Sequence, residues 1–233
     1  SGVLAGPGQW SGTDKRTMSY GYGLSATPLQ IAMAYAALAN DGVLTAPTFV
    51  KGQRNEGERV VDARVADQVL RMMQTVTETG GTATGAAILG YHVGGKTGTA
   101  RKFSPTGGYS NKYIALFAGV VPVENPRFSM VVVINEPDSS KGYGYGGGAV
   151  AAPVFRNVMA GALRLMDVPP DDIETWLAAQ AAEQAKRAKA AGGAGESGPV
   201  LPTAVAASTA GTASGPASLP DALPEPVTVG GAR

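Results

Sequence analysis

The chain has 233 residues, which is long enough for one sizeable hydrophobic core and an extension. Charged residues make up 16% and the net charge is +1, so the composition provides no basic field for binding nucleic acid. There is no cysteine and only one histidine, His92, which excludes disulfides, thiolate metal sites and multi-histidine metal sites within the chain.

The first residues are polar and rich in glycine, and they begin with SGVL rather than with methionine. They contain no charged segment followed by an apolar one, as a signal peptide would, and no window is apolar enough to span a bilayer. We therefore expect the chain to be a piece of a longer protein whose targeting segment lies upstream.

The first predicted helix begins with unusually complete signals. Thr27 can cap the helix, Pro28 occupies its first position, and Gln30 follows three residues after the cap, which completes a capping box. Apolar residues fill positions 29–38, so we expect this helix to be buried nearly all round. The sequence NDG at residues 40–42 ends it.

A second helix is predicted over residues 63–79, capped by Asp62 and ended by Gly80 and Gly81. Its predicted buried stripe consists of Val65, Val69, Met72, Met73 and Val76.

Three strands are predicted next, over residues 92–101, 114–121 and 127–135. The last two are rich in Val, Ile, Phe and Ala and are separated by a short turn at residues 122–126, which is typical of antiparallel neighbours.

A third helix is predicted over residues 151–166, where Pro153 is tolerable because it falls in the first turn. Its predicted buried residues are Val154, Phe155, Val158, Met159, Ala162 and Leu165. After it, residues 171–191 predict a weak helix with only Ile173, Trp176 and Leu177 to bury. Residues 192–233 are dominated by Gly, Ala, Pro, Ser and Thr, and we expect them to be disordered.

The most informative segment is GGKTGTAR at residues 94–101. In an extended strand Lys96, Gly98 and Ala100 face one side, whereas Thr97, Thr99 and Arg101 face the other, and strand twist lets the long lysine reach around the edge. An ammonium and two hydroxyls grouped in this way predict an anion site. A carboxylate or a phosphate would fit.

A phosphate-binding loop is one interpretation, because residues 90–97 (GYHVGGKT) match the pattern G-x-x-x-x-G-K-[ST]. That loop requires a buried strand before it and a helix immediately after it. Residues 84–89 form only a short segment with few β-branched residues, and residues 98–105 contain an early glycine and then a proline, so the context disfavours this interpretation.

The second interpretation is the K-T-G element of active-site-serine penicillin-recognising enzymes, which lies on an edge strand of an antiparallel sheet. Residues 91–102 (YHVGGKTGTARK) resemble the third catalytic motif of class B penicillin-binding proteins, and the cell-division FtsI type is the nearest match. Further strings appear in the order of that family, and the resemblance extends over residues 1–170: GYGLSATPLQ (21–30), GGTA (80–83), FAGVVP (117–122), VVVINEP (131–137), YGG (145–147) and APVF (152–155).

The resemblance implies an α/β (α+β) fold, the C-terminal part of a transpeptidase domain in which helices pack on an antiparallel sheet. It implies a peptidoglycan D,D-transpeptidase that cross-links stem peptides during septal cell-wall synthesis through a serine acyl-enzyme and needs no cofactor. The implied partners are the D-Ala-D-Ala end of a stem peptide, β-lactam antibiotics and other divisome proteins. The implied location is the periplasmic face of the inner membrane, anchored by an N-terminal segment absent from this chain.

By the same resemblance, Lys96 supplies positive charge and joins the proton relay, and the hydroxyls of Thr97 and Thr99 hold the terminal carboxylate of the substrate. The backbone N–H of Thr99 is one of two oxyanion donors. Gly98 leaves room for the substrate backbone.

Arg101 adds charge behind the threonines in this interpretation, and Tyr143 and Tyr145 form an aromatic wall beside the site. Alternatively, Arg101 and Lys102 are solvated residues that protect a strand edge, and the tyrosines belong to an ordinary glycine-rich loop. We expect His92 to be a packed or surface residue of the strand rather than a catalytic base.

The nucleophile motifs of the family, S-x-x-K and S-x-N, are absent. Lys15 follows Ser11 by four positions instead of three, and Asn111 follows Ser110 directly. We therefore expect the nucleophile to lie upstream of residue 1 and this chain alone to be inactive. A non-catalytic penicillin-fold module for binding or sensing remains an alternative, and the division-type strings disfavour a β-lactamase.

Overall fold

The computed structural model describes residues 2–21, 23–104, 107–142 and 144–192. The described residues up to 190 belong to one unit. The segment predicted to be disordered lies, from residue 193 onward, outside the described residues. Among those described, no helix combines the length and hydrophobicity that a membrane span requires.

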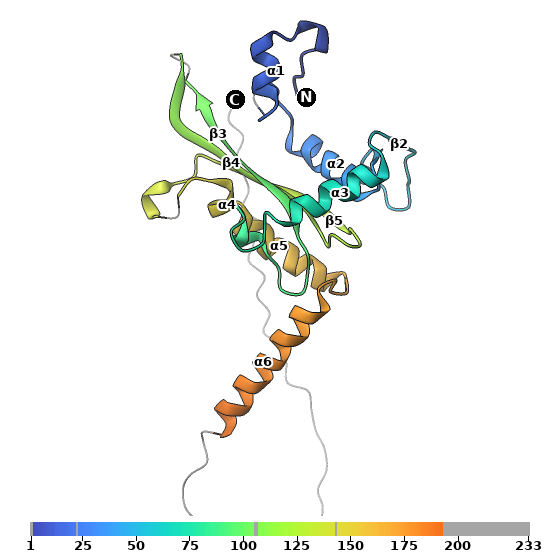
Figure 1. Ribbon diagram of the computed structural model, residues 1–233, viewed down its shortest axis with the longest axis vertical. Coiled ribbons are helices and arrows are strands. Elements are labelled where there is room, and N and C mark those ends of the chain that lie inside the picture. The colour runs from blue at the N-terminus through green and yellow to red at the C-terminus, as the bar shows by residue number, and fades with distance from the viewer. Residues whose placement is uncertain (1, 22, 105–106, 143, 193–233) are drawn as a thin grey trace, which may run out of the picture. The chain divides into compact units, whose positions relative to one another are not determined.

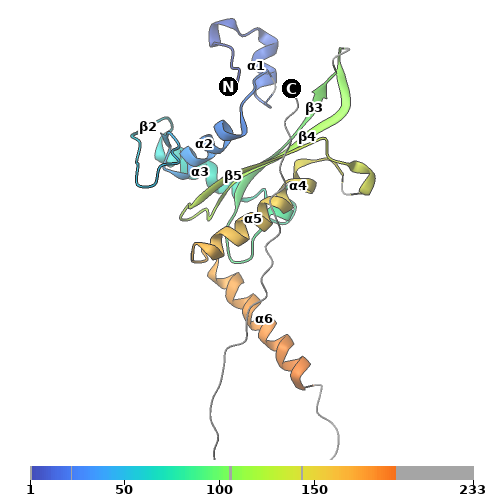
Figure 2. The same ribbon diagram turned by 180° about the vertical axis from the view of Figure 1, so that it is seen from behind.

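The main sheet has three antiparallel strands in the order β3-β4-β5, with β4 at its centre (Figure 1). Strand β3 is Gly94–Phe103, β4 is Tyr109–Val121 and β5 is Phe128–Asn135. The three predicted strands are confirmed, as is the short connection between the last two. The sheet lies between α5 on one side and α2 and α3 on the other (Figures 1 and 2).

The two faces of the central strand bury alternate residues, as strand geometry requires. Phe117 packs edge-to-face on Phe155 of α5 (Ala152–Leu165), with ring centroids 5.0 Å apart. Val120 packs on the other face with Leu70. Both phenylalanines are fully buried, so they anchor α5 beneath the sheet.

The predicted helix over residues 151–166 is confirmed, but part of its predicted buried stripe is wrong. Phe155 and Met159 are buried as predicted, together with Leu163. Leu165 is 82% exposed, and Val154 and Val158 also lie on the solvent side. Helix α5 has apolar residues on more than one face, so its periodicity alone cannot identify the buried face. Contact with the sheet determines which face is buried.

Helix α2 (Pro28–Ala39) begins as predicted: the Thr27 side chain accepts the Gln30 N–H, and the Gln30 side chain accepts the Thr27 N–H. The prediction that it is buried nearly all round is wrong, since only Ala37 is fully buried and Leu29 is 55% exposed. Its Tyr35 and Leu38 pack toward the sheet.

Helix α3 (Ala63–Gln74) is capped by Asp62 as predicted but ends five residues earlier than expected. Thr75 and Thr77 follow it, and their hydroxyls donate to the carbonyls of Met72 and Gln74. Such local bonds compete with continuation of the helix. The predicted stripe is also shifted, because the fully buried residues are Ala66 and Leu70, whereas Val65 and Met72 are exposed.

Several short elements were not predicted. Helix α1 (Gly12–Met18) has a capping box between Ser11 and Asp14, a spacing that could have been recognised in the sequence. Strands β1 (Val43–Thr45) and β2 (Gly57–Arg59) form a separate antiparallel pair of only three residues each. The remaining elements are η1 (Pro7–Gln9), η2 (Thr84–Ala86), η3 (Ser139–Lys141), α4 (Gly147–Val150) and α6 (Ile173–Gly192).

Helix α6 occupies the segment for which the sequence predicts a weak helix. The three apolar residues expected to bury differ in their environment: Ile173 and Leu177 are more than half exposed. Trp176 is half-buried and lies so close to Gly90 that a Cβ there would be 2.8 Å from the indole ring. The indole therefore connects the start of α6 to the turn before β3.

Candidate functional site

The predicted anion-binding segment lies on β3, and β4 pairs with only one edge of that strand. Lys96 is opposite Ala118, Thr97 opposite Phe117 and Thr99 opposite Ala115. On its other edge β3 has no strand partner among the described residues. The phosphate-loop interpretation is wrong, because Lys96 and Thr97 lie inside a ten-residue strand and not at the N-terminus of a helix.

The two threonines face the side of the sheet on which α4 lies. The backbone N–H of Gly147, the first residue of α4, donates to Thr99 Oγ1 over 3.1 Å. The Thr99 oxygen acts as the acceptor in this hydrogen bond. Its hydroxyl hydrogen can therefore still be donated to an anion that approaches the strand edge.

The approach of α4 to β3 depends on two glycines. A Cβ at Gly147 would lie 2.1 Å from the carbonyl oxygen of Leu116, and one at Gly148 would lie 1.9 Å from the carbonyl oxygen of Thr82. Both neighbours are backbone atoms, which cannot move aside as a flexible side chain can. Glycine is thus required at positions 147 and 148 by close packing against the backbone of the sheet and of Thr82.

Thr82 also reaches the site: its Oγ1 lies 3.3 Å from Thr97 Oγ1. Neither Thr82 nor Gly147 was predicted to belong to the site, although both lie in strings that carried the family resemblance. Thr82 precedes Thr97 by 15 residues and Gly147 follows Thr99 by 48, and no local pattern links such distant positions.

Lys96 projects from the opposite face of β3 to the threonines, and its Nζ donates to the carbonyl oxygen of Thr97 over 3.0 Å. The side chain is exposed. Within the described part of the chain, no carboxylate forms an ion pair with it, so its positive charge is available to an incoming group.

Packing within the sheet also favours glycine at position 98, in addition to the room that glycine would leave for a substrate. A Cβ at this position would lie 2.8 Å from Cγ of Leu116 on the neighbouring strand. The bulk of Leu116 therefore favours glycine here independently of any ligand.

Arg101 and Tyr145 are connected through Tyr113, on the same face of the sheet as the threonines. The Arg101 guanidinium lies 5.9 Å from the Tyr113 ring centroid and donates to Asn111 Oδ1 over 2.8 Å. Tyr113 stacks on Tyr145 with centroids 4.0 Å apart and an interplanar angle of 18°. Tyr143 lies outside the described residues.

His92 lies just before β3, as part of a structural junction. Asp171, between α5 and α6, accepts the backbone N–H of His92 over 2.8 Å and that of Glu124 over 3.3 Å. Its other close contact is His92 Nδ1 at 3.6 Å. The carboxylate thus joins the start of β3 to the β4–β5 turn.

Charges at the far end of the sheet are paired. Glu136 accepts hydrogen bonds from Lys102 and Lys112, which lower the pKa of its carboxyl from 4.5 to about 2. Ser110 donates to the carbonyl of Lys102, so it takes part in the β3–β4 hairpin. Across the described ranges, no three metal-ligating side chains come together.

An antiparallel sheet between helical layers, with a lysine, threonines and glycine on its edge strand, defines the active-site-serine penicillin-recognising class. The family described as penicillin binding protein transpeptidase domain matches residues 1–160. The chain belongs to this family.

Named relatives agree with this assignment. The chain is 45% identical over 176 residues to peptidoglycan D,D-transpeptidase FtsI of Escherichia coli K12, covering 75% of this chain and 29% of the relative. It is 43% identical over 171 residues to the probable peptidoglycan D,D-transpeptidase PenA of Neisseria meningitidis serogroup A, covering 73% and 29%. The apo transpeptidase domain of Burkholderia pseudomallei penicillin-binding protein 3 matches with a TM-score of 0.66 and 40% identity, covering 73% and 51%. The chain thus spans less than a third of these curated relatives and about half of that solved domain.

Proposed function

We propose that the protein containing this chain is a peptidoglycan D,D-transpeptidase, to which residues 1–170 contribute the C-terminal part of the catalytic domain. A serine outside this chain attacks the carbonyl carbon of the penultimate D-Ala of a stem peptide and releases the terminal D-Ala. An amine of a neighbouring peptide then attacks the resulting ester, which forms the cross-link and frees the serine.

The β3 edge supplies the electrostatic part of this reaction. The hydroxyls of Thr97 and Thr99 bind the terminal carboxylate, and the backbone N–H of Thr99 donates to the oxyanion of the tetrahedral intermediate. Lys96 contributes positive charge and takes part in proton transfer between the serine and its neighbours.

The observation that carries this proposal is the hydrogen bond from Gly147 N–H to Thr99 Oγ1. It orients the hydroxyl of a residue on an open strand edge, with the uncompensated ammonium of Lys96 three positions away. A preorganised donor beside a free positive charge is what recognition of a carboxylate requires.

Arg101 and Tyr145 extend the site along the strand. The ring pair of Tyr113 and Tyr145 offers an apolar surface for the part of a stem peptide or β-lactam that lies beyond the carboxylate. Arg101 adds long-range positive charge, because its guanidinium is held beside Tyr113 rather than directed at Thr99.

The biological setting follows from the proposed substrate. The protein acts on the periplasmic face of the inner membrane, held by an N-terminal anchor, and works with other divisome proteins in septal wall synthesis. β-Lactam antibiotics acylate the same serine because their carboxylate and strained amide imitate the D-Ala-D-Ala end.

The test is covalent labelling of the intact protein by a fluorescent penicillin, with Lys96→Ala as the variant and Lys51→Ala, a change at an exposed loop lysine, as the control. We expect rapid labelling of the wild type and the control and a loss of at least about 100-fold in Lys96→Ala. An intact, folded protein that takes up no label would instead support a non-catalytic binding or sensor module.

A further inference from the structure

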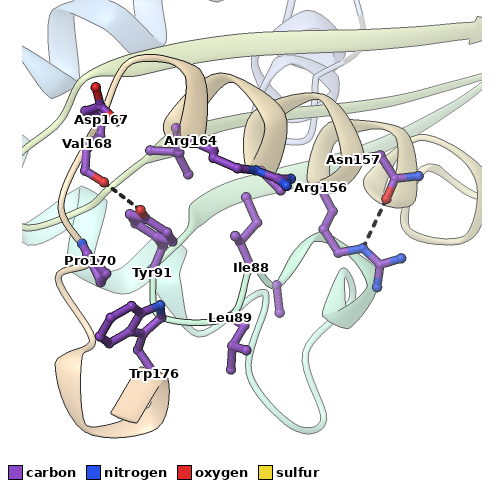
Figure 3. Close-up of a pocket in the computed structure, with 13 residues that line it drawn as sticks. Ile88, Leu89, Tyr91, Arg156, Asn157, Arg164, Asp167, Val168, Pro170 and Trp176 are labelled. Atoms are coloured by element: carbon purple, nitrogen blue, oxygen red, sulfur yellow. Dashed lines mark hydrogen bonds between the residues drawn. The ribbon is translucent and has the colours of Figure 1, made fainter. Parts of the chain in front are cut away.

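A second concave surface lies on the α5 side of the sheet, the face that also carries Thr97 and Thr99, but none of the β3 threonines lines it. It is a cavity of about 620 Å³ between α5, the start of α6 and the turn before β3 (Figure 3). We call it the α5–α6 groove. The lining residues that matter here are Ile88, Leu89, Tyr91, Arg156, Arg164 and Trp176.

The floor of the groove is apolar. Ile88 is buried, whereas Leu89 beside it is 62% exposed. Tyr91 is held in place because its hydroxyl donates to the carbonyl of Val168 over 2.6 Å. The exposed Leu89 side chain beside the Tyr91 ring leaves apolar surface in contact with water. A side chain of a ligand can cover this surface.

One wall of the groove is positively charged. Arg156 and Arg164 are eight residues apart on α5, which places them on nearby faces about 12 Å apart along the helix axis. In Figure 3 both project from α5, Arg164 above Ile88 and Arg156 to the right of it. The guanidinium of Arg156 donates to the amide oxygen of Asn157 at 3.4 Å. Neither arginine forms an ion pair in the described ranges of the chain.

The groove continues along α6. A second cavity of about 530 Å³ shares Leu89 and Trp176 with the first and is lined further on by Glu183. Glu183 accepts a hydrogen bond from Arg187 over 3.3 Å, and Lys186 lines the same cavity. Asp167, at the α5–α6 corner, is the acidic residue that lines the first cavity. The unpaired positive charge of the first cavity is therefore that of Arg156 and Arg164, and Lys186 adds to it along α6.

We propose that the α5–α6 groove docks an acidic, leucine-bearing segment of a partner protein. An aliphatic side chain of that segment packs between Leu89 and Trp176, and carboxylates pair with the two arginines. The apolar surface of Leu89 and Trp176 alone would bind many apolar segments. Arg156 and Arg164 favour an acidic segment because its carboxylates complement their positive charge. The groove lies outside the catalytic machinery proposed above.

The test uses a fluorescein-labelled peptide, SEELLDES, and measures fluorescence polarisation against the intact protein. We expect saturable binding that weakens as salt increases, and a loss of about tenfold or more in the charge reversal Arg156→Glu/Arg164→Glu. The milder variant Arg156→Gln/Arg164→Gln should lose several-fold. Arg54→Glu, a reversal at an exposed loop arginine, should bind like the wild type. Penicillin labelling of every variant reports folding independently of the groove.

Several outcomes would overturn the proposal. They are absence of peptide binding at about 1 mM, equal binding by the charge-reversed protein, or equal binding of the peptide SEEGGDES, which would indicate a simple anion site. Charge-dependent binding to phosphatidylglycerol vesicles without peptide binding would assign the groove to a lipid surface and would also overturn it. Normal peptide binding by a protein that takes up no penicillin would refute the proposed enzyme and leave this inference standing.

Discussion

Thr99 and Gly147 are 48 positions apart in the chain, and the backbone N–H of Gly147 donates to the Thr99 hydroxyl oxygen over 3.1 Å. The bond joins the edge strand β3 to the first residue of α4. It gives the hydroxyl a defined orientation before any ligand arrives, which reduces the ordering that binding would otherwise require.

Replacing Thr99 by valine keeps the branched shape and removes the hydroxyl. We expect the second-order rate of penicillin acylation of the intact protein to fall about 10- to 100-fold, as expected for the loss of a hydrogen bond to a charged carboxylate. Thr99→Ser restores a hydroxyl and should recover most of the rate. A Thr99→Val protein that is acylated at the wild-type rate would remove Thr99 from the site.

Gly147→Ala places a Cβ 2.1 Å from the carbonyl oxygen of Leu116 in β4 and 2.7 Å from that of Gly98 in β3, so α4 must move away from the sheet. We expect a loss of about 1–3 kcal/mol in the free energy of unfolding, measured by urea denaturation, together with slower acylation. The control is Gly161→Ala in α5, where nothing lies within 4 Å of the added methyl group. That change should stabilise the protein by about 0.5–1 kcal/mol.

The ion pairs of Glu136 should make the stability of the folded protein depend on pH. Its folded-state pKa is about 2, below the ordinary 4.5, because Lys102 and Lys112 hydrogen-bond its carboxylate. A depressed pKa stabilises the fold above the unfolded pKa, and this contribution is lost as the pH falls through the folded pKa. The stability difference between wild type and Glu136→Gln should therefore be largest above about pH 4.5 and disappear near pH 2.

The measurement for Glu136 is the midpoint of urea denaturation as a function of pH. Glu58→Gln, a change at an exposed glutamate of β2, serves as the control and should follow the wild type throughout. A constant difference between wild type and Glu136→Gln from neutral to acid pH would contradict the assigned ion pairs.

Tyr145 tests the aromatic part of the site. Its ring stacks on Tyr113, so Tyr145→Phe should retain both the stack and the acylation rate. Tyr145→Ala should lose about 0.5–1.5 kcal/mol of ring interaction and slow acylation by β-lactams that carry an aromatic side chain. Equal rates for Tyr145→Ala and the wild type with such compounds would show that the rings only support the loop.

The elements that the sequence predicted best carry strong local signals. The caps at Thr27 and Asp62 depend on contacts within three residues, and both are present in the structure. Strand character over β3, β4 and β5 follows from runs of β-branched and small residues. The ordered strings around Lys96 likewise identified the family without any coordinates.

The predictions that proved wrong concern which helix face is buried and where a helix ends, because the sequence is compatible with more than one answer there. On α3 and α5 several faces are apolar, and contact with the sheet selected Leu70 and Leu163 rather than Val65 and Leu165. The end of α3 depended on Thr75 and Thr77, whose hydroxyls bond to nearby carbonyls. Periodicity reports which faces could be buried, but only packing decides which face is buried.

By itself, the sequence determined the local chemistry of this protein: a strand that carries Lys96, Thr97 and Thr99, its flanking caps and turns, and membership of a transpeptidase family. Only the tertiary structure decided what orients those side chains, by bringing Gly147 to Thr99 and Tyr145 over Tyr113. The reason is the range of the interactions. Hydrogen bonds and propensities within a few residues can be recognised in the sequence, whereas contacts across tens of residues exist only once the sheet and helices have packed.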